Sequence, residues 1–219
     1  MDVEYYQPFY EEYVSAIKKG KYSCHPLGTI TNFVSNGRTA PKDDYTDDSS
    51  GIPIIKVATA SKKLVNFEKL GYVKQGYEGN EKVQKGDIFI LSAAHQAEYV
   101  GKNVSFLAQD PSKDTYFVGE LIGVRANPKI CDEYYLFGFL SNKFTFVLIN
   151  REKRGQTSHI YPADLREIFI PTPPLKTQKK IAREIQSRMK TTNNLKKESE
   201  VEFEATKARV EKMILGKEA

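Results

Sequence analysis

The chain has little cysteine, no tryptophan and no long apolar run, and these shortages narrow the class of protein. A membrane-spanning helix needs about 20 consecutive apolar residues, so we expect no segment to cross a bilayer. Two cysteines in 219 residues, Cys24 and Cys131, are too few for the disulfide framework of a small secreted protein. The first residues also lack the basic and apolar regions of a secretion signal. The sequence therefore predicts a reduced, cytoplasmic protein.

Signatures of catalysis and metal binding are missing as well. No glycine-rich phosphate loop and no Gly-x-Ser-x-Gly nucleophile turn occurs. The Glu-x-Lys and Asp-x-Lys triplets of simple metal-dependent nucleases and the Asn-Pro-Pro-aromatic motif of adenine methyltransferases are also absent. The histidines, His25, His95 and His159, are far apart, and Cys24 directly precedes His25, whereas neighbours in a chain rarely share one zinc ion. We expect no catalytic residue, no metal site and no cofactor bound to this chain.

Composition and charge favour an ordinary folded domain. Hydrophobic residues make up 40% and charged residues 28%, which provides enough apolar surface for a packed core. Lysine and arginine number 33 against 28 acidic residues, a net charge of +5. This mild excess permits a nucleic-acid partner without requiring one, because the clustering of cations matters more than their sum.

The hydrophobic pattern predicts an α+β fold, with a mixed, strand-rich body and a few helices. Helical spacing predicts a short helix over 8–19 and a buried helix over 133–148 that breaks near Ser141 and Asn142. The turn at Gly86 precedes a run, 88–91, that is apolar enough to be buried on both faces. The expected strands are 28–34, 52–57, 88–91, 104–107, 116–124 and 165–170.

The character of the chain changes at Pro171, Pro173 and Pro174, which predict a stiff, extended hinge. Helix-forming residues dominate after it, so we divide the chain into a body, 1–170, and a long helical region, 171–219. A helix of about 40 residues would be about 60 Å long and would outreach its own body, which favours a coiled-coil arm. The apolar residues along this helix do not follow a strict heptad repeat. The polar stretch 191–194 is compatible with a kink or with the end of a helical segment. The apolar side chains expected to dimerise along one side are Ile181, Ile185, Met189, Leu195, Phe203, Val210 and Met213.

Three polar loops, 35–39, 92–102 and 151–159, carry side chains suited to reading a nucleic-acid groove. Arginine and lysine suit phosphates and guanine edges, and glutamine suits adenine. Each loop alone also fits a solvated turn, but three of them on a mildly basic body without catalytic signatures favour nucleic acid. The candidate contacts are Arg38, His95, Gln96, Lys102, Arg151, Lys153, Arg154, Gln156 and Thr157.

Several motifs, in a fixed order, resemble the DNA-specificity subunit of type I restriction–modification systems. They cover nearly the whole chain, and the last two are the most specific. The landmarks are Leu27-Gly28-Thr29-Ile30, Gly37-Arg38-Thr39, Gly51-Ile52-Pro53-Ile54-Ile55, Lys85-Gly86-Asp87-Ile88, Gly155-Gln156-Thr157, Ile170-Pro171-Thr172-Pro173-Pro174-Leu175 and Gln178-Lys179-Lys180-Ile181-Ala182. The resemblance implies that the body is a target recognition domain and that the chain is a non-enzymatic reader of double-stranded DNA.

The resemblance also implies partners in a prokaryotic cytoplasm. In this family each recognition domain reads one half of a split target, and the long helices act as a spacer. The helices also dock methyltransferase subunits, which modify adenine with S-adenosylmethionine, and a motor-nuclease subunit can join them. The usual subunit has two recognition domains, whereas this chain has one and no internal repeat. We therefore expect a homodimer with antiparallel helices that reads an interrupted palindrome.

Two other functions remain compatible with the sequence. One is a coiled-coil adaptor whose body binds protein and does not bind DNA. The other is a detached recognition domain of a fused restriction–methylation enzyme. Salt-dependent binding of random duplex separates the adaptor from both DNA-binding alternatives.

Overall fold

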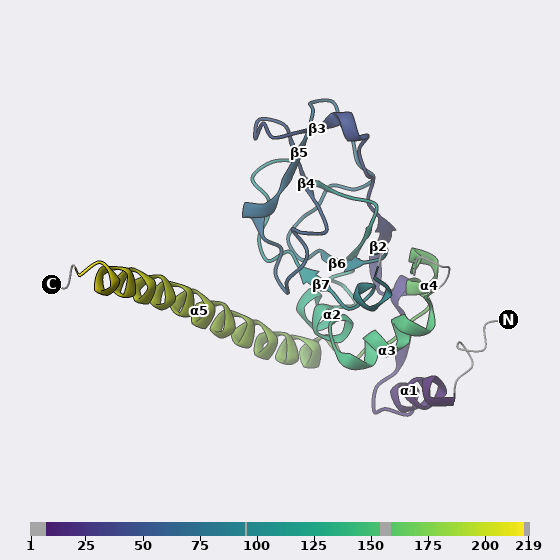
Figure 1. Ribbon diagram of the computed structural model, residues 1–219. Helices are drawn as coiled ribbons and strands as arrows, with labels where there is room; N and C mark the ends of the chain where they lie inside the picture. Colours follow the sequence, from purple (N-terminus) through teal and green to yellow (C-terminus); the bar gives the residue numbers. More distant parts are fainter. Residues whose placement is uncertain (1–7, 95, 154–158, 217–219) are drawn as a thin grey trace.

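The computed structural model describes residues 8–94, 96–153 and 159–216. Figure 1 shows a strand-rich head, a group of short helices at its base, and one long helix that leaves the head. The chain therefore has the mixed α+β fold and the long C-terminal helix that its sequence predicts.

Two four-stranded sheets form the head. The first has the order β2-β9-β6-β7, and every neighbouring pair in it is antiparallel. The second has the order β3-β5-β4-β8, in which the β4–β8 pair is parallel. The strands of the first sheet are β2 (Thr31–Asn36), β9 (Leu121–Ala126), β6 (Ile88–Leu91) and β7 (Val104–Phe106), and those of the second are β3 (Tyr45–Thr46), β5 (Gly71–Val73), β4 (Ile52–Ile55) and β8 (Tyr116–Phe117).

Both faces of strand β6 are buried, because the strand lies between two hydrophobic clusters. Successive side chains of a strand point to opposite faces. Ile88 and Ile90 pack into a cluster with the helices, whereas Phe89 and Leu91 pack into a second cluster between the two sheets. Phe89 meets Phe117 of β8 edge-on, with ring centroids 5.2 Å apart. The prediction of a strand buried on both faces at 88–91 is confirmed.

Two of the helices at the base of the head, α2 and α3, begin at side-chain caps. Asp132 Oδ1 accepts hydrogen bonds from the Tyr134 and Tyr135 N–H groups and caps α2. Asn142 Oδ1 accepts from the Thr145 N–H at 3.0 Å and caps α3. The expected helix over 133–148 is therefore two helices, broken at the predicted place. The helices are α1 (Pro8–Lys18), α2 (Glu133–Leu140), α3 (Lys143–Arg151), α4 (Pro162–Arg166) and α5 (Leu175–Ile214).

Three of the expected strands differ from the structure. The strand expected over 116–124 is two strands in different sheets, because a turn closed by the Leu121 N–H and the Val118 carbonyl separates β8 from β9. The strand expected over 165–170 begins as α4, since Pro162 starts a helical turn that includes Leu165. The strand expected over 28–34 begins with a 3-10 turn, and β2 starts at Thr31.

A two-stranded sheet joins the two ends of the head. Strand β1 (Cys24–Pro26) pairs antiparallel with β10 (Phe169–Pro171). Beyond this pair, the Thr172 N–H donates to the Ser23 carbonyl at 2.7 Å. The proline segment before α5 is therefore extended, as predicted, and held along its length by the head.

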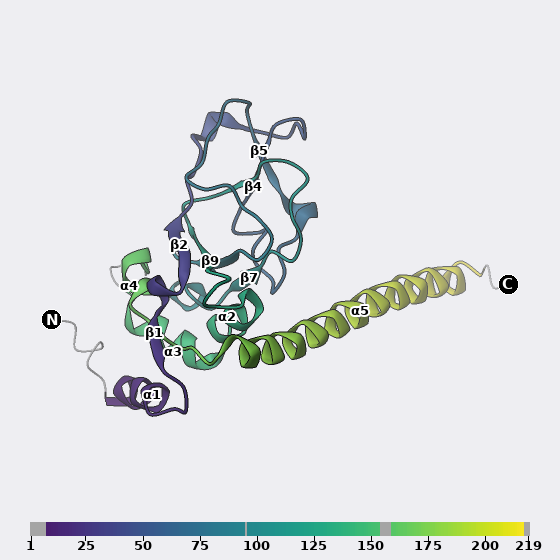
Figure 2. The ribbon, with the colours of Figure 1, turned by 180° about the vertical axis from the view of Figure 1, so that it is seen from behind.

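Helix α5 is continuous over 40 residues and passes through 191–194 without a break. Its first turns pack against α2. The remainder extends away from both sheets, as the two opposite views in Figures 1 and 2 show. At about 1.5 Å per residue the helix is about 60 Å long, so most of its length lies beyond the head.

Candidate nucleic-acid interface

Three of the polar loops singled out in the sequence are joined at one residue, Ser92, directly after β6. The Ser92 N–H donates to the Glu120 carbonyl at 2.8 Å, and the Ile160 N–H donates to the Ser92 carbonyl at 3.0 Å. Asn36 Nδ2 donates to Ser92 Oγ at 3.2 Å. Asn36 of the first loop, Ser92 of the second and Ile160, which directly follows the third, therefore meet where β6 ends.

Two more contacts join the second and third loops. Ala93 pairs with His159 in an antiparallel bridge. Lys153 Nζ donates to the Ala97 carbonyl at 2.9 Å and lies 5.2 Å from the Phe146 ring centroid. Because these contacts leave Lys153 half-buried, desolvation lowers its pKa. This lysine fixes the loops to one another as well as contributing charge.

Backbone hydrogen bonds to Phe117 and Asn80 hold the loop that carries Arg38 in place. The Arg38 N–H donates to the Phe117 carbonyl at 3.0 Å, and Asn80 Nδ2 donates to the carbonyls of Asn36 and Gly37 at 3.0 and 3.2 Å. A Cβ on Gly37 would lie 2.0 Å from the Phe117 oxygen, so only glycine fits there. The Arg38 side chain itself is exposed and donates to the Glu78 carbonyl at 3.2 Å. The structure thus presents a guanidinium on a fixed backbone.

The predicted contact residues differ in how free they are to meet a ligand. Gln96 and Lys102 are exposed on the second loop. Arg151, by contrast, is 15% exposed and pairs with Glu11 of α1 at 3.0 Å, so it links α3 to α1 in this structure. His95, Arg154, Gln156 and Thr157 lie outside the described residues.

Two exposed tyrosines, one in the second loop and one just after the third, were not predicted as contact residues from the sequence. Tyr99 is 40% and Tyr161 is 50% exposed. Lys102 Nζ lies 5.8 Å from the Tyr99 ring centroid, and the His159 ring stacks on Tyr161 at 6.3 Å between centroids. Exposed tyrosines beside a lysine or a histidine suit phosphate and base contacts. The signal in the sequence that could have identified these tyrosines is an aromatic residue within or beside a polar loop.

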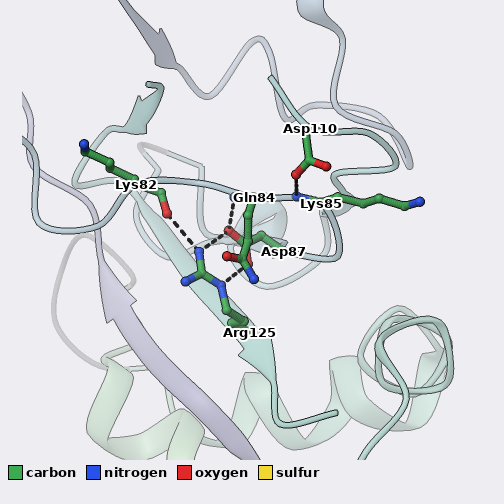
Figure 3. Close-up of polar contacts among 6 residues, drawn as sticks. All are labelled: Lys82, Gln84, Lys85, Asp87, Asp110 and Arg125. Carbon is green, nitrogen blue, oxygen red and sulfur yellow. Dashed lines mark hydrogen bonds and ion pairs between the residues drawn. The ribbon is translucent and has the colours of Figure 1, made fainter. Parts of the chain in front are cut away.

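A buried ion pair fixes the turn that starts β6 (Figure 3). Arg125 of β9 donates from Nε and Nη2 to the two carboxylate oxygens of Asp87 at 2.7 and 2.8 Å. Arg125 Nη2 also donates to the Lys82 carbonyl, and the Gln84 N–H donates to Asp87 Oδ2 at 2.9 Å. Gly86 closes the same turn at φ +92°, a conformation that favours glycine. This cluster therefore fixes the turn before β6 and supports the core of the head.

The described residues contain neither a candidate metal site nor a helix suited to cross a membrane. Within 8–94, 96–153 and 159–216, no group of three or more His, Cys, Asp or Glu residues gathers closely enough to hold a metal ion. No helix in this part of the chain combines the length and the apolar character that crossing a membrane requires.

The second candidate surface is the projecting part of α5. Of the residues expected to dimerise, Ile185 and Met189 pack against the core of their own head. Ile181, Leu195, Phe203, Val210 and Met213 remain exposed. At about 3.6 residues per turn these exposed side chains share one side of the helix. Val201, also exposed, lies on the opposite side.

Comparisons with known proteins agree on one family. Residues 23–205 match the family described as the type I restriction modification DNA specificity domain. A curated relative, the MjaX type I restriction enzyme specificity subunit of Methanocaldococcus jannaschii, is 30% identical over 199 residues, which cover 88% of this chain and 45% of the relative.

Solved structures share the fold. The HsdS subunit from Thermoanaerobacter tengcongensis has a TM-score of 0.57 at 19% identity over 95% of this chain and 49% of its own. The type I restriction–modification S subunit from M. genitalium has a TM-score of 0.60 at 15% identity, covering 89% of this chain and 46% of its own. The chain thus spans about half the length of the relatives that it matches.

Proposed function

The chain belongs to the family of type I restriction–modification DNA specificity subunits, and from this premise we propose that two copies act together to read a bipartite DNA target. The family membership gives a role in DNA sequence specificity. In our proposal residues 1–170 form the recognition domain, and residues 171–219 form the spacer and dimerisation region. One recognition domain per chain then supplies one half-site, and twofold symmetry supplies the other.

The observation that carries this proposal is the exposed apolar side of α5 beyond the head. Leu195, Phe203 and Met213 each expose more than half of their surface. Large apolar residues aligned on one side of a helix are stabilised by packing against a second helix. A second copy of the same helix is the partner that would also place a second recognition domain.

The charges beside this apolar side fit an antiparallel pair. If Leu195 of one copy faces Met213 of the other, then Lys196 faces Glu211 and Glu200 faces Lys207, each pair occurring twice by symmetry. On the other flank, Glu202 faces Arg209. An antiparallel pair also inverts one head relative to the other, as an inverted repeat in DNA requires.

The joined loops would then supply the DNA contacts. We assign phosphate contact to Lys102 and Lys153 and base contact to Arg38 and Gln96, because these residue types suit those contacts and the loops that carry them are linked through Ser92 and its neighbours. His95, Arg151, Arg154, Gln156 and Thr157 remain candidates on the same segments. Subunits of this family are non-catalytic. We therefore assign adenine modification with S-adenosylmethionine to methyltransferase subunits that dock on this chain, with a motor-nuclease subunit as a further partner.

Sedimentation of matched variants tests the dimer. Phe203→Asp places a charge on the apolar side of α5 and should convert a dimer at micromolar concentration into a monomer. Val201→Asp places the same charge on the opposite side and should leave the dimer unchanged. A monomeric wild type would contradict the proposal. A band shift with random duplex at low and high salt separates it from the adaptor alternative, which predicts no salt-dependent DNA binding.

A further inference from the structure

The start of α5 is fastened to the head by a buried side chain, Gln178. Glutamine is mostly exposed in folded proteins, whereas this residue has no exposed surface. We propose that Gln178 is a positioning residue whose amide fixes the angle at which α5 leaves the head and thereby selects the separation of the two DNA half-sites. The inference rests on the proposed dimer and adds a residue that acts on spacing rather than on base contact.

The Gln178 amide bonds to three separate points of the backbone. Its Oε1 accepts from the Asp132 N–H at 2.9 Å. Its Nε2 donates to the Ile130 carbonyl at 3.0 Å and to the Pro173 carbonyl at 2.8 Å. Asp132 is also the residue that caps α2. One side chain therefore ties the first turn of α5 to the start of α2 and to the proline segment.

A second contact between α5 and the head, further along α5, fixes the direction of the helix. Gly138 of α2 lets α5 approach closely, since a Cβ there would lie 2.4 Å from Ile185 Cδ1. Ile185 is seven residues after Gln178, which is about 10 Å along the helix. Between them Ala182 is buried. Gln178 and Ile185, about 10 Å apart along α5, are both held against the head, and together they determine the direction in which the rest of α5 extends.

The proline segment is held at the same place. Tyr135 Oη donates to the Pro171 carbonyl at 2.6 Å. With the Thr172 bond to Ser23, this contact leaves the segment little freedom to act as a swivel. Gln178 thus connects the proline segment, the start of α2 and the first turn of α5.

The length of α5 amplifies any change at this joint. In the proposed antiparallel pair the centre of contact falls near residue 204, about 39 Å from Gln178 at 1.5 Å per residue. A tilt of about 10° would displace that centre by about 7 Å, which is about two base pairs at 3.4 Å each. Small changes in the joint are therefore large enough to change which spacer length fits.

Binding to duplexes with varied spacers tests the role of Gln178. Inverted half-sites would be separated by spacers that differ one base pair at a time. We expect the wild type to prefer one spacer by about tenfold over its neighbours, because a mismatched span lowers the effective concentration of the second head. Gln178→Met keeps the length of the side chain but removes the amide, and should flatten this preference while the affinity for a single half-site stays unchanged. Gln186→Met, on an exposed site of the same helix, should behave as the wild type.

A distance measurement in the wild type makes the test independent of how the variant folds. Nitroxides at Lys62→Cys and Lys197→Cys, on a Cys24→Ser background and diluted with unlabelled chain, report the separation of head and rod. We expect one narrow distance distribution, broadened by Gln178→Met. A broad wild-type distribution, or a Gln178→Met protein with wild-type spacer preference, would overturn the inference. If the wild type binds no paired half-sites at all, the proposed dimer fails, while the distances still decide whether Gln178 fixes the angle.

Discussion

Arg125 of β9 holds both carboxylate oxygens of the buried Asp87, which directly precedes the neighbouring strand β6. Asp87 has no exposed surface, and Arg125 also lies 4.5 Å from the Phe33 ring centroid. Burial raises the pKa of Asp87, whereas the Arg125 ion pair and the Gln84 N–H hold that rise back. The Arg125 guanidinium therefore stabilises the turn that precedes β6.

Replacing Arg125 should destabilise the head in a pH-dependent way. Arg125→Met leaves Asp87 buried without its cation, at a cost of about 3–5 kcal/mol at neutral pH. The folded-state pKa of Asp87 then rises further above its unfolded value, so stability is lost as the pH rises through the folded pKa. Urea unfolding should show a larger deficit at pH 7 than at pH 5.

An exposed ion pair nearby is the matched control. Lys82 Nζ lies 2.5 Å from Asp114 Oδ2, and both side chains are more than half exposed. Such pairs contribute little because water screens them. Lys82→Met should therefore leave stability unchanged at both pH values. Equal losses in the two variants would show that burial does not govern the Asp87 pair.

The thiol of Cys131 should be inert in the folded protein. Burial, with Asp132 and Glu133 nearby, raises the pKa of Cys131 from about 9 to about 12. An aromatic disulfide reagent at pH 8 should therefore modify Cys24 first and Cys131 only on unfolding. Early modification of Cys131 would contradict the packing around it.

The same pKa predicts a loss of stability in alkali. The unfolded thiol ionises near pH 9, whereas the folded thiol keeps its proton to about pH 12. Folding stability therefore falls as the pH rises through that window. Cys131→Ala should lack this part of the alkaline loss, although its cavity lowers stability at every pH. Parallel pH profiles of the two proteins would refute the assignment.

Two kinds of loop variant should separate phosphate contact from base contact. Lys102→Ala should weaken binding to all sequences alike and reduce the salt slope of log K by about 1. Gln96→Ala should relax discrimination at one base position, by about 1–3 kcal/mol. Lys190→Ala, on α5, provides the control and should change neither quantity. A uniform effect of both loop variants would remove base reading from Gln96.

The antiparallel register of α5 can be tested by exchanging charges. Lys207→Glu should weaken the dimer, because it places like charges opposite Glu200 of the second copy. Adding Glu200→Lys should restore it. Lys207 also pairs within its own helix with Glu204 at 2.7 Å. The exchange Glu204→Lys with Lys207→Glu preserves that internal pair and should not restore the dimer; restoration would mean that the register is wrong.

The parts of the fold that the sequence predicts are those with a strong local pattern. The run 88–91 is apolar at every position, and the break at Asn142 follows from a side chain that caps a helix. Strands β1, β3 and β5 have two or three residues each, too few to show alternation. Their positions depend on partners distant in sequence, as β1 depends on β10.

The candidate site shows the same division. The sequence identifies the three loops by their residue types, but it does not indicate that Ser92 joins them or that Arg151 pairs with α1. Likewise, one-sided spacing identifies the apolar residues of α5, while the structure assigns Ile185 and Met189 to the head and leaves the later ones exposed. Gln178 could be noticed in a motif, yet its role depends on three backbone groups brought together by folding.

Selection of bound duplexes from a random library tests the central claim most directly. Repeated capture by the wild-type protein at physiological salt should enrich two copies of one short sequence, in inverted orientation, separated by a spacer of fixed length. Enrichment of a single uninterrupted site, or of no sequence at all, would contradict the account of two symmetric heads held apart by paired helices.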